Sequence, residues 1–237
     1  MDTETLLRYE PHAHTAEVSR CAKMPAAQMV HEVKKAGYDA VVVTDHYDPD
    51  FFVGAEEGES YRARLHDFFA GYRAAKEAGD KEGLLVLPAL EMRNIHGMED
   101  YLIYGITEEQ LSDLGRCLSY MTLEESLAFV RRSHGLLFQA HPFRGYLNCM
   151  PASLMDGVEV LNANPRHDSQ NHRALAFGQE NGLYYTAGSD VHQLGDAGSA
   201  GVLAPRADTI EEYCENLRNK RHTCFVRENG QDRLIEG

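Results

Sequence analysis

The sequence predicts an α/β protein, because two kinds of segment alternate along the chain, and this alternation favours a closed barrel over an open sheet. The first kind is a short apolar run rich in β-branched or aromatic residues, which is typical of buried parallel strands. The second kind has the spacing and capping residues of helices. A third observation is that histidine or a carboxylate stands at the end of many apolar runs. In a barrel of parallel strands those ends meet at one face.

The predicted strands begin with residues 6–14, where an apolar start leads into two histidines. Residues 39–46 and 83–91 are nearly continuous apolar runs, as expected for strands that are buried on both faces. The remaining predicted strands are residues 99–105, 135–142, 157–164, 183–190, 199–205 and 222–227.

Helices are predicted between these strands. Pro25 suits the first turn of a helix over residues 25–38. Thr122, followed three residues later by Glu125, forms a capping box at the start of residues 122–133. The other predicted helices are residues 60–80, which end near Gly79, and residues 107–118, 167–182 and 208–220.

The length of 237 residues fits one α/β barrel, so we expect a single domain over residues 1–237. No run is long and apolar enough to cross a membrane, and the N-terminal residues lack the apolar core of a signal peptide. We therefore expect a cytoplasmic protein. The five cysteines include no CxxC pair, which favours structural thiols in a reducing compartment. Cys21, just after the first histidines, is also placed to approach a site.

The net charge of −14 bears on the kind of partner. Such a chain repels nucleic acid backbones and anionic membranes unless a basic patch intervenes, and no block of lysine or arginine is present. We therefore expect a small phosphorylated metabolite as the partner, without membrane binding, and consider long nucleic acids disfavoured. The sequence does not indicate an oligomeric state.

Seven potential metal ligands lie at or just past the predicted strand ends: His12, His14, His46, Glu91, His141, Asp190 and His192. Because strand side chains alternate with period two, both members of His-x-His and of Asp-x-His face the same side. Imidazole and carboxylate ligands together suit zinc, manganese and iron. Glu91 has two oxygens, so we expect it to bridge two ions of a site that clamps a phosphoryl group. The chain is therefore predicted to be a metal-dependent hydrolase.

In their order along the chain, HAHT, TDH, a glutamate after a strand, AHP and GSDVH resemble the PHP family, named for polymerase and histidinol phosphatase domains. The resemblance extends from Tyr9 to Val202. It implies a distorted (β/α)7 barrel similar to a TIM barrel, with the metal site at the C-terminal ends of the strands. It also implies hydrolysis of phosphoesters with two or three manganese, iron or zinc ions, held by the seven residues named above.

Two positions depart from the family pattern. Many members have Asp or His where this chain has Ser19 and Arg20, and many have His where it has Tyr101. These differences leave open whether the site holds one, two or three ions. Arg20 is either a phosphate-binding residue that replaces the charge of one ion or a surface arginine.

The predicted reaction is hydrolysis of a small phosphomonoester, histidinol phosphate or a nucleotide, by water that the metal activates. Asp190 or His192 is expected to orient or deprotonate this water. The predicted substrate-binding residues are Arg20, Arg93, Arg144, Arg166 and His167.

Three other functions fit parts of the sequence. An amidohydrolase-like reaction is the first, because the same metal-activated water attacks a carbonyl carbon. The second is a metal-binding domain without catalysis, which the missing ligand near Arg20 suggests. The third is a nuclease-like domain docked to a partner, which requires a basic groove that the composition disfavours.

Overall fold

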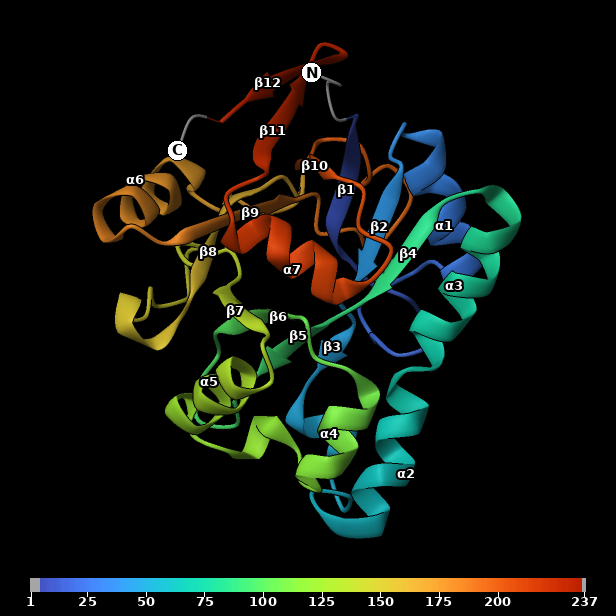
Figure 1. Ribbon diagram of the computed structural model, residues 1–237, viewed down its shortest axis with the longest axis vertical. Coiled ribbons are helices and arrows are strands. Elements are labelled where there is room, and N and C mark those ends of the chain that lie inside the picture. The colour runs from blue at the N-terminus through green and yellow to red at the C-terminus, as the bar shows by residue number, and fades with distance from the viewer. Residues whose placement is uncertain (1–4, 236–237) are drawn as a thin grey trace.

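The computed structural model describes residues 5–235, whose strands form two six-stranded sheets (Figure 1). The first sheet contains, in order, β12 (Gln231–Leu234), β11 (Thr223–Glu228), β10 (Ala200–Pro205), β1 (Leu6–Ala13), β2 (Ala40–Val43) and β4 (Leu85–Pro88). The second contains β3 (His46–Tyr47), β5 (Leu90–Arg93), β6 (Asp100–Tyr104), β7 (Leu136–Gln139), β8 (Gly157–Asn162) and β9 (Tyr184–Gly188). The predicted mixed α/β fold is confirmed.

Two segments predicted as single strands are divided between the sheets. Residues 39–46 contribute β2 to the first sheet and open β3 in the second, and residues 83–91 are divided in the same way between β4 and β5. Backbone pairing continues across both breaks, since Ala89 N donates to Val43 O at 2.9 Å and Glu91 N donates to Asp45 O at 3.0 Å. After each break the chain continues in the second sheet, so His46 lies in β3 and Glu91 lies in β5 of that sheet.

The far edge of the second sheet returns to β1 through the segment after β9. Val191 N donates to His12 O, and His14 N donates to Val191 O, each at 3.0 Å. Apart from this isolated bridge, the strands within residues 5–235 are grouped in two sheets rather than in one hydrogen-bonded ring. The closed barrel predicted from the sequence is thus not confirmed.

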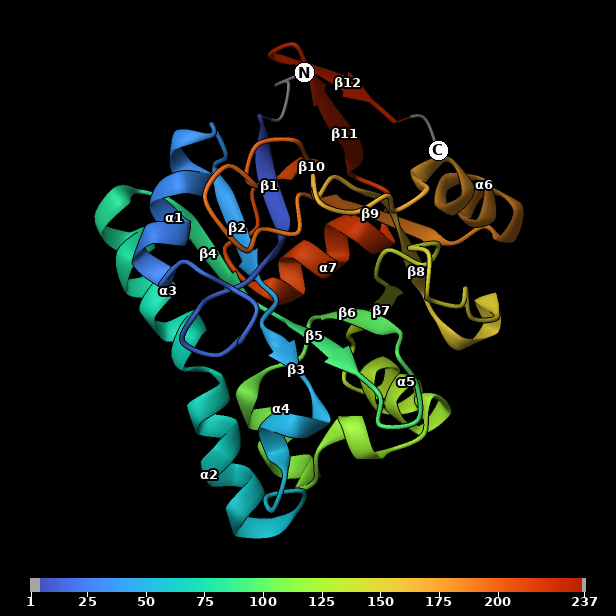
Figure 2. The same cartoon turned by 180° about the vertical axis from the view of Figure 1, so that it is seen from behind.

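Helices cover the outer faces of the sheets. The helices are α1 (Ala26–Lys35), α2 (Gly58–Phe68), α3 (Ala70–Glu82), α4 (Glu108–Leu114), α5 (Leu123–Arg132), α6 (Asn171–Asn181) and α7 (Ile210–Arg218). Short 3-10 turns are η1 (Pro49–Phe52), η2 (Leu118–Tyr120) and η3 (Ala152–Leu154). Figure 2 shows α1 and α3 side by side against β2 and β4, where Met29, Val33 and Val41 belong to one buried apolar cluster. Burying these side chains stabilises the edge of the first sheet.

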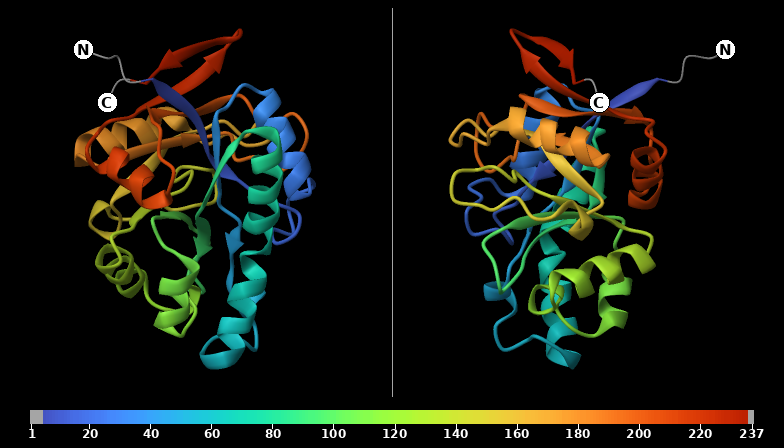
Figure 3. Two further views of the ribbon diagram at one scale, coloured as in Figure 1. Left: turned by 45° about the vertical axis from the view of Figure 1, so that its right-hand side comes forward. Right: turned by 90° about the vertical axis from the view of Figure 1, so that its left-hand side faces the viewer.

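The helix predicted over residues 60–80 is instead two helices, α2 and α3, which follow one another nearly end to end (Figure 3). They are separated at Phe69, and α3 continues beyond Gly79 to Glu82, where Gly83 adopts the left-handed conformation that ends helices. Gly79 is buried against the Val86 side chain of β4, where a Cβ atom would clash. It therefore allows close packing of helix on strand and does not end the helix.

The capping box of Thr122 and Glu125 is confirmed at the start of α5. The predicted helix over residues 107–118 ends earlier, at Leu114, because Gly115 has a left-handed backbone. All five cysteines are free thiols. Over residues 5–235, none of the helices combines the length and the apolar character that a membrane span requires.

Candidate metal centre

The structure brings all seven predicted ligands together around the carboxylate of Glu91 or the neighbouring Asp190. Oε1 of Glu91 lies 3.3 Å from Nε2 of His12 and 3.4 Å from Nε2 of His141. Its Oε2 lies 3.4 Å from Nε2 of His14 and 3.0 Å from Nδ1 of His46. Each oxygen of Glu91 thus faces a different pair of imidazoles, which is the arrangement expected of a bridging carboxylate.

Asp190 and His192 complete the cluster from the segment that follows β9. Oδ1 of Asp190 lies 3.4 Å from Nε2 of His12, 3.5 Å from Nε2 of His14 and 3.2 Å from Nδ1 of His192. Asp190 has a positive φ of 53°, a conformation that aspartate tolerates better than most residues. The carboxylate faces His12 of β1 and His14, which follows the end of that strand.

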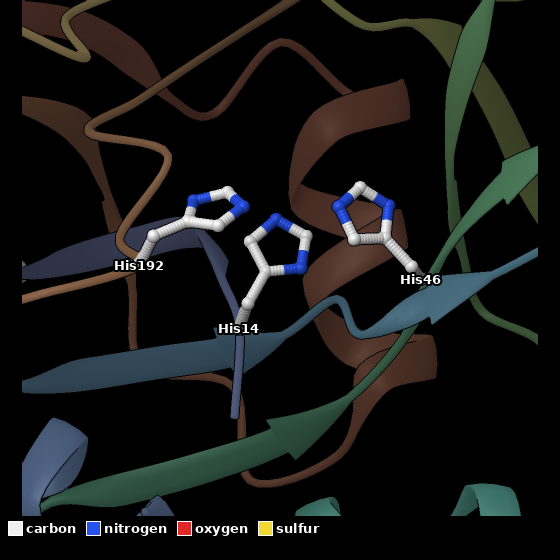
Figure 4. Close-up of side chains that lie close together, drawn as sticks. All are labelled: His14, His46 and His192. Atoms are coloured by element: carbon white, nitrogen blue, oxygen red, sulfur yellow. The ribbon is translucent and has the colours of Figure 1, made fainter. Parts of the chain in front are cut away.

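Within residues 5–235, four groups of side chains have ligand atoms within 4.8 Å of one another. Figure 4 shows one of them, in which the rings of His14, His46 and His192 lie next to each other. The ring centroid of His14 is 4.4 Å from that of His46 and 4.2 Å from that of His192. The other groups are His12, His14 and Asp190; Glu91, Asp100 and His141; and His46, Asp48 and Asp100.

Asp48 and Asp100 were not predicted as site residues. Asp48 lies two residues after His46, so the period-two rule that links the two histidines of HAHT would also have selected it. Asp100 begins β6 and lines the same pocket as His46 and His141. Its neighbour Tyr101 is buried and does not line the pocket. The position predicted to lack a ligand therefore has a carboxylate one residue earlier.

The donor atoms of this cluster fit divalent cations. The buried ligand atoms His12 Nε2, His14 Nε2, His46 Nδ1 and Glu91 Oε1 have no hydrogen-bond partner. Leaving buried polar atoms unpaired costs free energy, so a group of them is exceptional in a folded protein. Divalent cations bound among these atoms would satisfy them.

The charges of the cluster also favour cations. Burial lowers the pKa of His12, but the carboxylates of Asp190 and Glu159 outweigh it and hold this pKa well above its ordinary value. Burial raises the pKa of Glu91, but His12 and His46 hold it well below the usual range. The protein without metal therefore has ionised carboxylates in its interior that attract positive charge.

Side chains behind the ligands fix their orientation. Nδ1 of His12 lies 2.8 Å from Oε1 of Glu159, and Oε2 of Glu159 accepts a hydrogen bond from the backbone N–H of His141 at 2.9 Å. Ser19 accepts from the backbone N–H of His46 at 2.9 Å and donates to Asp45 at 2.7 Å. Ser19, one of the two positions that depart from the PHP pattern, thus holds the backbone of the candidate ligand His46.

The predicted substrate-binding residues all line one pocket of about 460 Å³ beside the cluster: Arg20, Arg93, Arg144, Arg166 and His167. Arg144 is buried and donates to Asp190 Oδ2 at 2.9 Å and to Asn162 Oδ1 at 3.0 Å. Arg93 forms a two-pronged ion pair with Asp100 at 2.8 and 2.9 Å. Burial and the charge of Arg144 lower the pKa of His167, which keeps its imidazole neutral.

Arg166 and Arg20 differ in their freedom to bind a ligand. Arg166 is held by both oxygens of Asp196, at 2.5 and 2.8 Å. Arg20 is exposed at the pocket and, among the residues that the structure describes, has no ion pair with a carboxylate. The pocket therefore presents buried and free cationic groups next to the candidate ligands, in a protein with a net charge of −14.

Comparison with known proteins places the fold. No family model and no curated protein matches the chain. A two-domain protein from Bacteroides vulgatus, described as containing a predicted PHP-like metal-dependent phosphoesterase, matches with a TM-score of 0.68 and 18% identity, covering 100% of this chain and 68% of that one. The chain has a PHP-like fold.

Two further structures share this PHP-like fold. PsfC from Pseudomonas syringae matches with a TM-score of 0.69 and 18% identity, over 95% of this chain and 93% of that one. An amidohydrolase from Chromobacterium violaceum, solved with bound sulfate and no metal, matches with a TM-score of 0.56 and 16% identity, over 87% and 95% of the two chains. The resemblance predicted from the sequence motifs is confirmed for the fold.

Proposed function

We propose that this protein is a metal-dependent phosphomonoesterase that acts on a small phosphorylated metabolite. The observation that carries the proposal is the pair of imidazoles on each oxygen of Glu91, with unpartnered nitrogens, next to an arginine-lined pocket. The PHP-like fold of a predicted metal-dependent phosphoesterase supports the same reaction. We further propose that residues 1–237 form one distorted (β/α)7 barrel domain, and that the protein is cytoplasmic.

The proposed ligands are those predicted from the sequence: His12, His14, His46, Glu91, His141, Asp190 and His192. Asp48 and Asp100 are additional candidates, because they share the groups that contain His46 and His141. Two or three manganese, iron or zinc ions held there would act as Lewis acids that lower the pKa of water and offset the charge on phosphoryl oxygens.

The arginines of the pocket have separate roles in this proposal. Arg144 is fixed by Asp190 and Asn162, so its guanidinium is held rigidly and can stabilise charge that develops on the phosphoryl group. Arg20 has no competing carboxylate and would bind a phosphoryl oxygen at the outer end of the pocket. Arg93 and Arg166 already form ion pairs, and we propose that they position the loops and add positive potential near the substrate.

Asp190 and His192 remain the candidates for accepting the proton of the attacking water. Oδ2 of Asp190 already accepts from Arg144 and Asn162, which fixes the carboxylate and its charge. His192 is partly exposed and lines the pocket, and its Nδ1 lies 3.0 Å from the backbone oxygen of Asp190. Of these two candidates, His192 is therefore the more accessible from the pocket.

A second candidate is an amidohydrolase-like reaction, because an amidohydrolase shares the fold. The two reactions need the same metal centre but differ in the group that the pocket binds. Four pocket arginines beside the ligands favour a tetrahedral dianion over a neutral carbonyl. The bound sulfate of that amidohydrolase is consistent with oxyanion binding in this fold.

Phosphate release from the metal-reconstituted protein tests the proposal. The substrates are a panel of phosphomonoesters that includes histidinol phosphate and nucleotides, with amides and lactones assayed in parallel. We expect phosphate release that is lost in His141→Ala and Asp190→Ala and retained in the control His31→Ala, whose side chain is exposed on α1 and pairs with Glu82. Turnover of amides alone would replace the phosphatase by the amidohydrolase, and metal binding without any turnover would leave a non-catalytic metal-binding domain.

A further inference from the structure

Exposed apolar side chains are concentrated next to the pocket of the candidate metal centre. Within residues 5–235, seven large hydrophobic side chains are exposed, and five of them lie at this pocket or beside it in sequence. Tyr146 lines the pocket itself. Each of the other four stands within two residues of a lining residue: Val53 after Phe51, Ile95 after Arg93, Met98 before Asp100, and Leu194 after Gln193. We call Val53, Ile95, Met98, Tyr146 and Leu194 the apolar rim.

Tyr146 is the largest member of the apolar rim, and its backbone is held in a turn. Its side chain is 63% exposed and, among the described residues, has no hydrogen bond, ion pair or ring contact. The backbone N–H of Leu147 donates to the carbonyl oxygen of Arg144 at 2.8 Å, which closes this turn. Because Asp190 and Asn162 fix the Arg144 side chain, an uncommitted aromatic ring stands two residues from a fixed guanidinium.

Phe51 gives the pocket a second aromatic side chain. It belongs to η1, is half-buried and lines the pocket. Its ring packs edge-on against Phe52 and Phe68, with centroids 5.2 and 5.8 Å apart. Small-molecule sites combine apolar and aromatic walls with a few polar groups that fix the orientation of the ligand. The pocket therefore has an apolar part in addition to its arginines and candidate ligands.

The geometry of phosphoester hydrolysis decides which part of a substrate meets the apolar rim. The water oxygen bonds to phosphorus, the bond from phosphorus to the ester oxygen breaks, and that oxygen takes a proton and leaves as the alcohol. The attacking and leaving oxygens are roughly in line, on opposite sides of phosphorus. The candidate ligands His12, His14 and Glu91 are buried, so a phosphoryl group beside them has its ester oxygen on the side of the exposed residues.

We propose that the substrate is a phosphomonoester of an apolar alcohol, aryl or alkyl, and that Tyr146 and the rest of the apolar rim contact this leaving group. The inference rests on the proposed function and names its substrate class. Exposed apolar surface beside a polar cleft is typical of ligand-binding grooves, because its removal from water is favourable. The net charge of −14 opposes binding to an anionic membrane, so the substrate is a free ester and not a membrane lipid.

The test compares phosphomonoesters of primary alcohols that differ in apolar surface. Metal-reconstituted wild type is assayed with benzyl phosphate, hexyl phosphate and glycerol phosphate esterified at a primary hydroxyl. Burial of an apolar group as large as benzyl or hexyl is worth about tenfold or more in binding, so kcat/KM for these two esters should exceed that for glycerol phosphate by at least about tenfold.

Substitution of Tyr146 tests its contact with the leaving group. Tyr146→Ala should lower the ratio of kcat/KM for benzyl phosphate to that for glycerol phosphate by about three- to tenfold, because the ring no longer covers the benzyl group. Tyr146→Phe keeps the ring and should keep the ratio. Leu6→Ala is the matched control, since Leu6 is also exposed but lies at the start of β1 and does not line the pocket.

Phosphonates give a readout that does not depend on turnover. Benzylphosphonate and methylphosphonate carry the same anionic group without a hydrolysable ester bond, and isothermal titration calorimetry measures their affinity for the metal-loaded protein. We expect benzylphosphonate to bind about tenfold more tightly. Its heat-capacity change on binding should also be more negative, which is the marker of apolar burial. Both differences should shrink in Tyr146→Ala.

The outcomes separate this inference from the proposed function. Equal kcat/KM for the three esters, with equal affinity for the two phosphonates, would overturn the apolar leaving group while phosphate release stands. A preference for benzyl phosphate that persists in Tyr146→Ala would overturn the contact with Tyr146. Tighter binding of benzylphosphonate without phosphate release from any ester would support the apolar rim and overturn the phosphatase. Wild type that self-associates, with a monomeric Leu194→Ser, would assign the apolar rim to a second copy of this chain instead.

Discussion

His12 and Glu159 share a hydrogen bond in the interior of the protein: Nδ1 of His12 lies 2.8 Å from Oε1 of Glu159, and neither side chain has exposed surface. In the neutral imidazole that a metal ion binds, a carboxylate at this position accepts from Nδ1–H, and Nε2 is then the nitrogen without a proton. That Nε2 atom faces Glu91 and Asp190 and has no partner of its own. Glu159 therefore selects the tautomer of His12 that can bind a metal.

Replacing Glu159 by glutamine should weaken metal binding without removing any proposed ligand. Support of this kind is worth about 10- to 100-fold in affinity, so we expect a loss of that size for Glu159→Gln. Competition with a chromogenic chelator measures the affinity, and Glu180→Gln, on the exposed face of α6, is the matched control. An affinity equal to that of wild type would show that Glu159 has only a packing role.

Removing the free arginine at the pocket should affect substrate binding more than turnover. Because Arg20 has no carboxylate partner among the described residues, Arg20→Ala leaves no unpaired acid behind. A contact made equally in the ground state and the transition state changes KM alone, and we expect an increase of about tenfold with kcat nearly constant. Steady-state kinetics with the best phosphomonoester measure both.

The control for this variant is Arg206→Ala. Arg206 is exposed, pairs with Asp208 and does not line the pocket. Its kinetics should match those of wild type. If Arg20→Ala also behaved as wild type, Arg20 would be the surface arginine of the alternative interpretation.

The residues of the histidine and aspartate motifs could be predicted because their relative geometry depends only on residues that are close in sequence. His-x-His on a strand places two imidazoles on one side whatever the rest of the fold does. Strand ends then collect at one face, so His12, Glu91 and Asp190 meet although they are far apart in sequence. The predicted arginines line the pocket beside these residues, and their contact with a substrate stays a prediction.

The rest depends on tertiary packing that periodicity does not encode. Glu159 lies inside an apolar strand and was not singled out, because its partner His12 comes from another strand. The break between β2 and β3 is invisible in a continuous apolar run, yet it decides which sheet holds His46. Whether Arg93 is free or paired depends on Asp100 of the neighbouring antiparallel strand.

Gly71 in α3 should be sensitive to the smallest substitution. Thr15 donates to Asp45 from its backbone N–H and from its hydroxyl, both at 2.7 Å, and these groups lie where a Cβ on Gly71 would be. Gly71→Ala must push the helix from this pair, and overpacking of a core typically costs about 1–3 kcal/mol. Urea unfolding monitored by circular dichroism measures the change in the free energy of unfolding.

Gly145→Ala is the comparison for Gly71→Ala. A Cβ at Gly145 meets nothing within 4 Å, and its φ is not in the left-handed region, so its stability should be close to that of wild type. Because Asp45 also bonds Ser19 behind the ligands, we expect Gly71→Ala to weaken metal binding as well. Unchanged stability in Gly71→Ala would show that α3 shifts away from Thr15 without strain.

His222, far from the metal centre in sequence and absent from its pocket, should make stability depend on pH. Burial lowers the pKa of His222 below its ordinary value, and its Nε2 lies 3.0 Å from the backbone oxygen of Tyr185. The unfolded chain therefore binds this proton more readily than the folded protein. The stability that the neutral imidazole contributes is present above the unfolded pKa of about 6.5 and is lost as pH falls through the folded value.

Urea unfolding at several pH values should show a smaller loss of stability in acid for His222→Gln than for wild type, and one proton limits the difference to about 1.4 kcal/mol per pH unit. His31→Gln, on the exposed side of α1, should keep the wild-type dependence. Parallel curves for wild type and His222→Gln would show that His222 carries no coupling between protonation and folding.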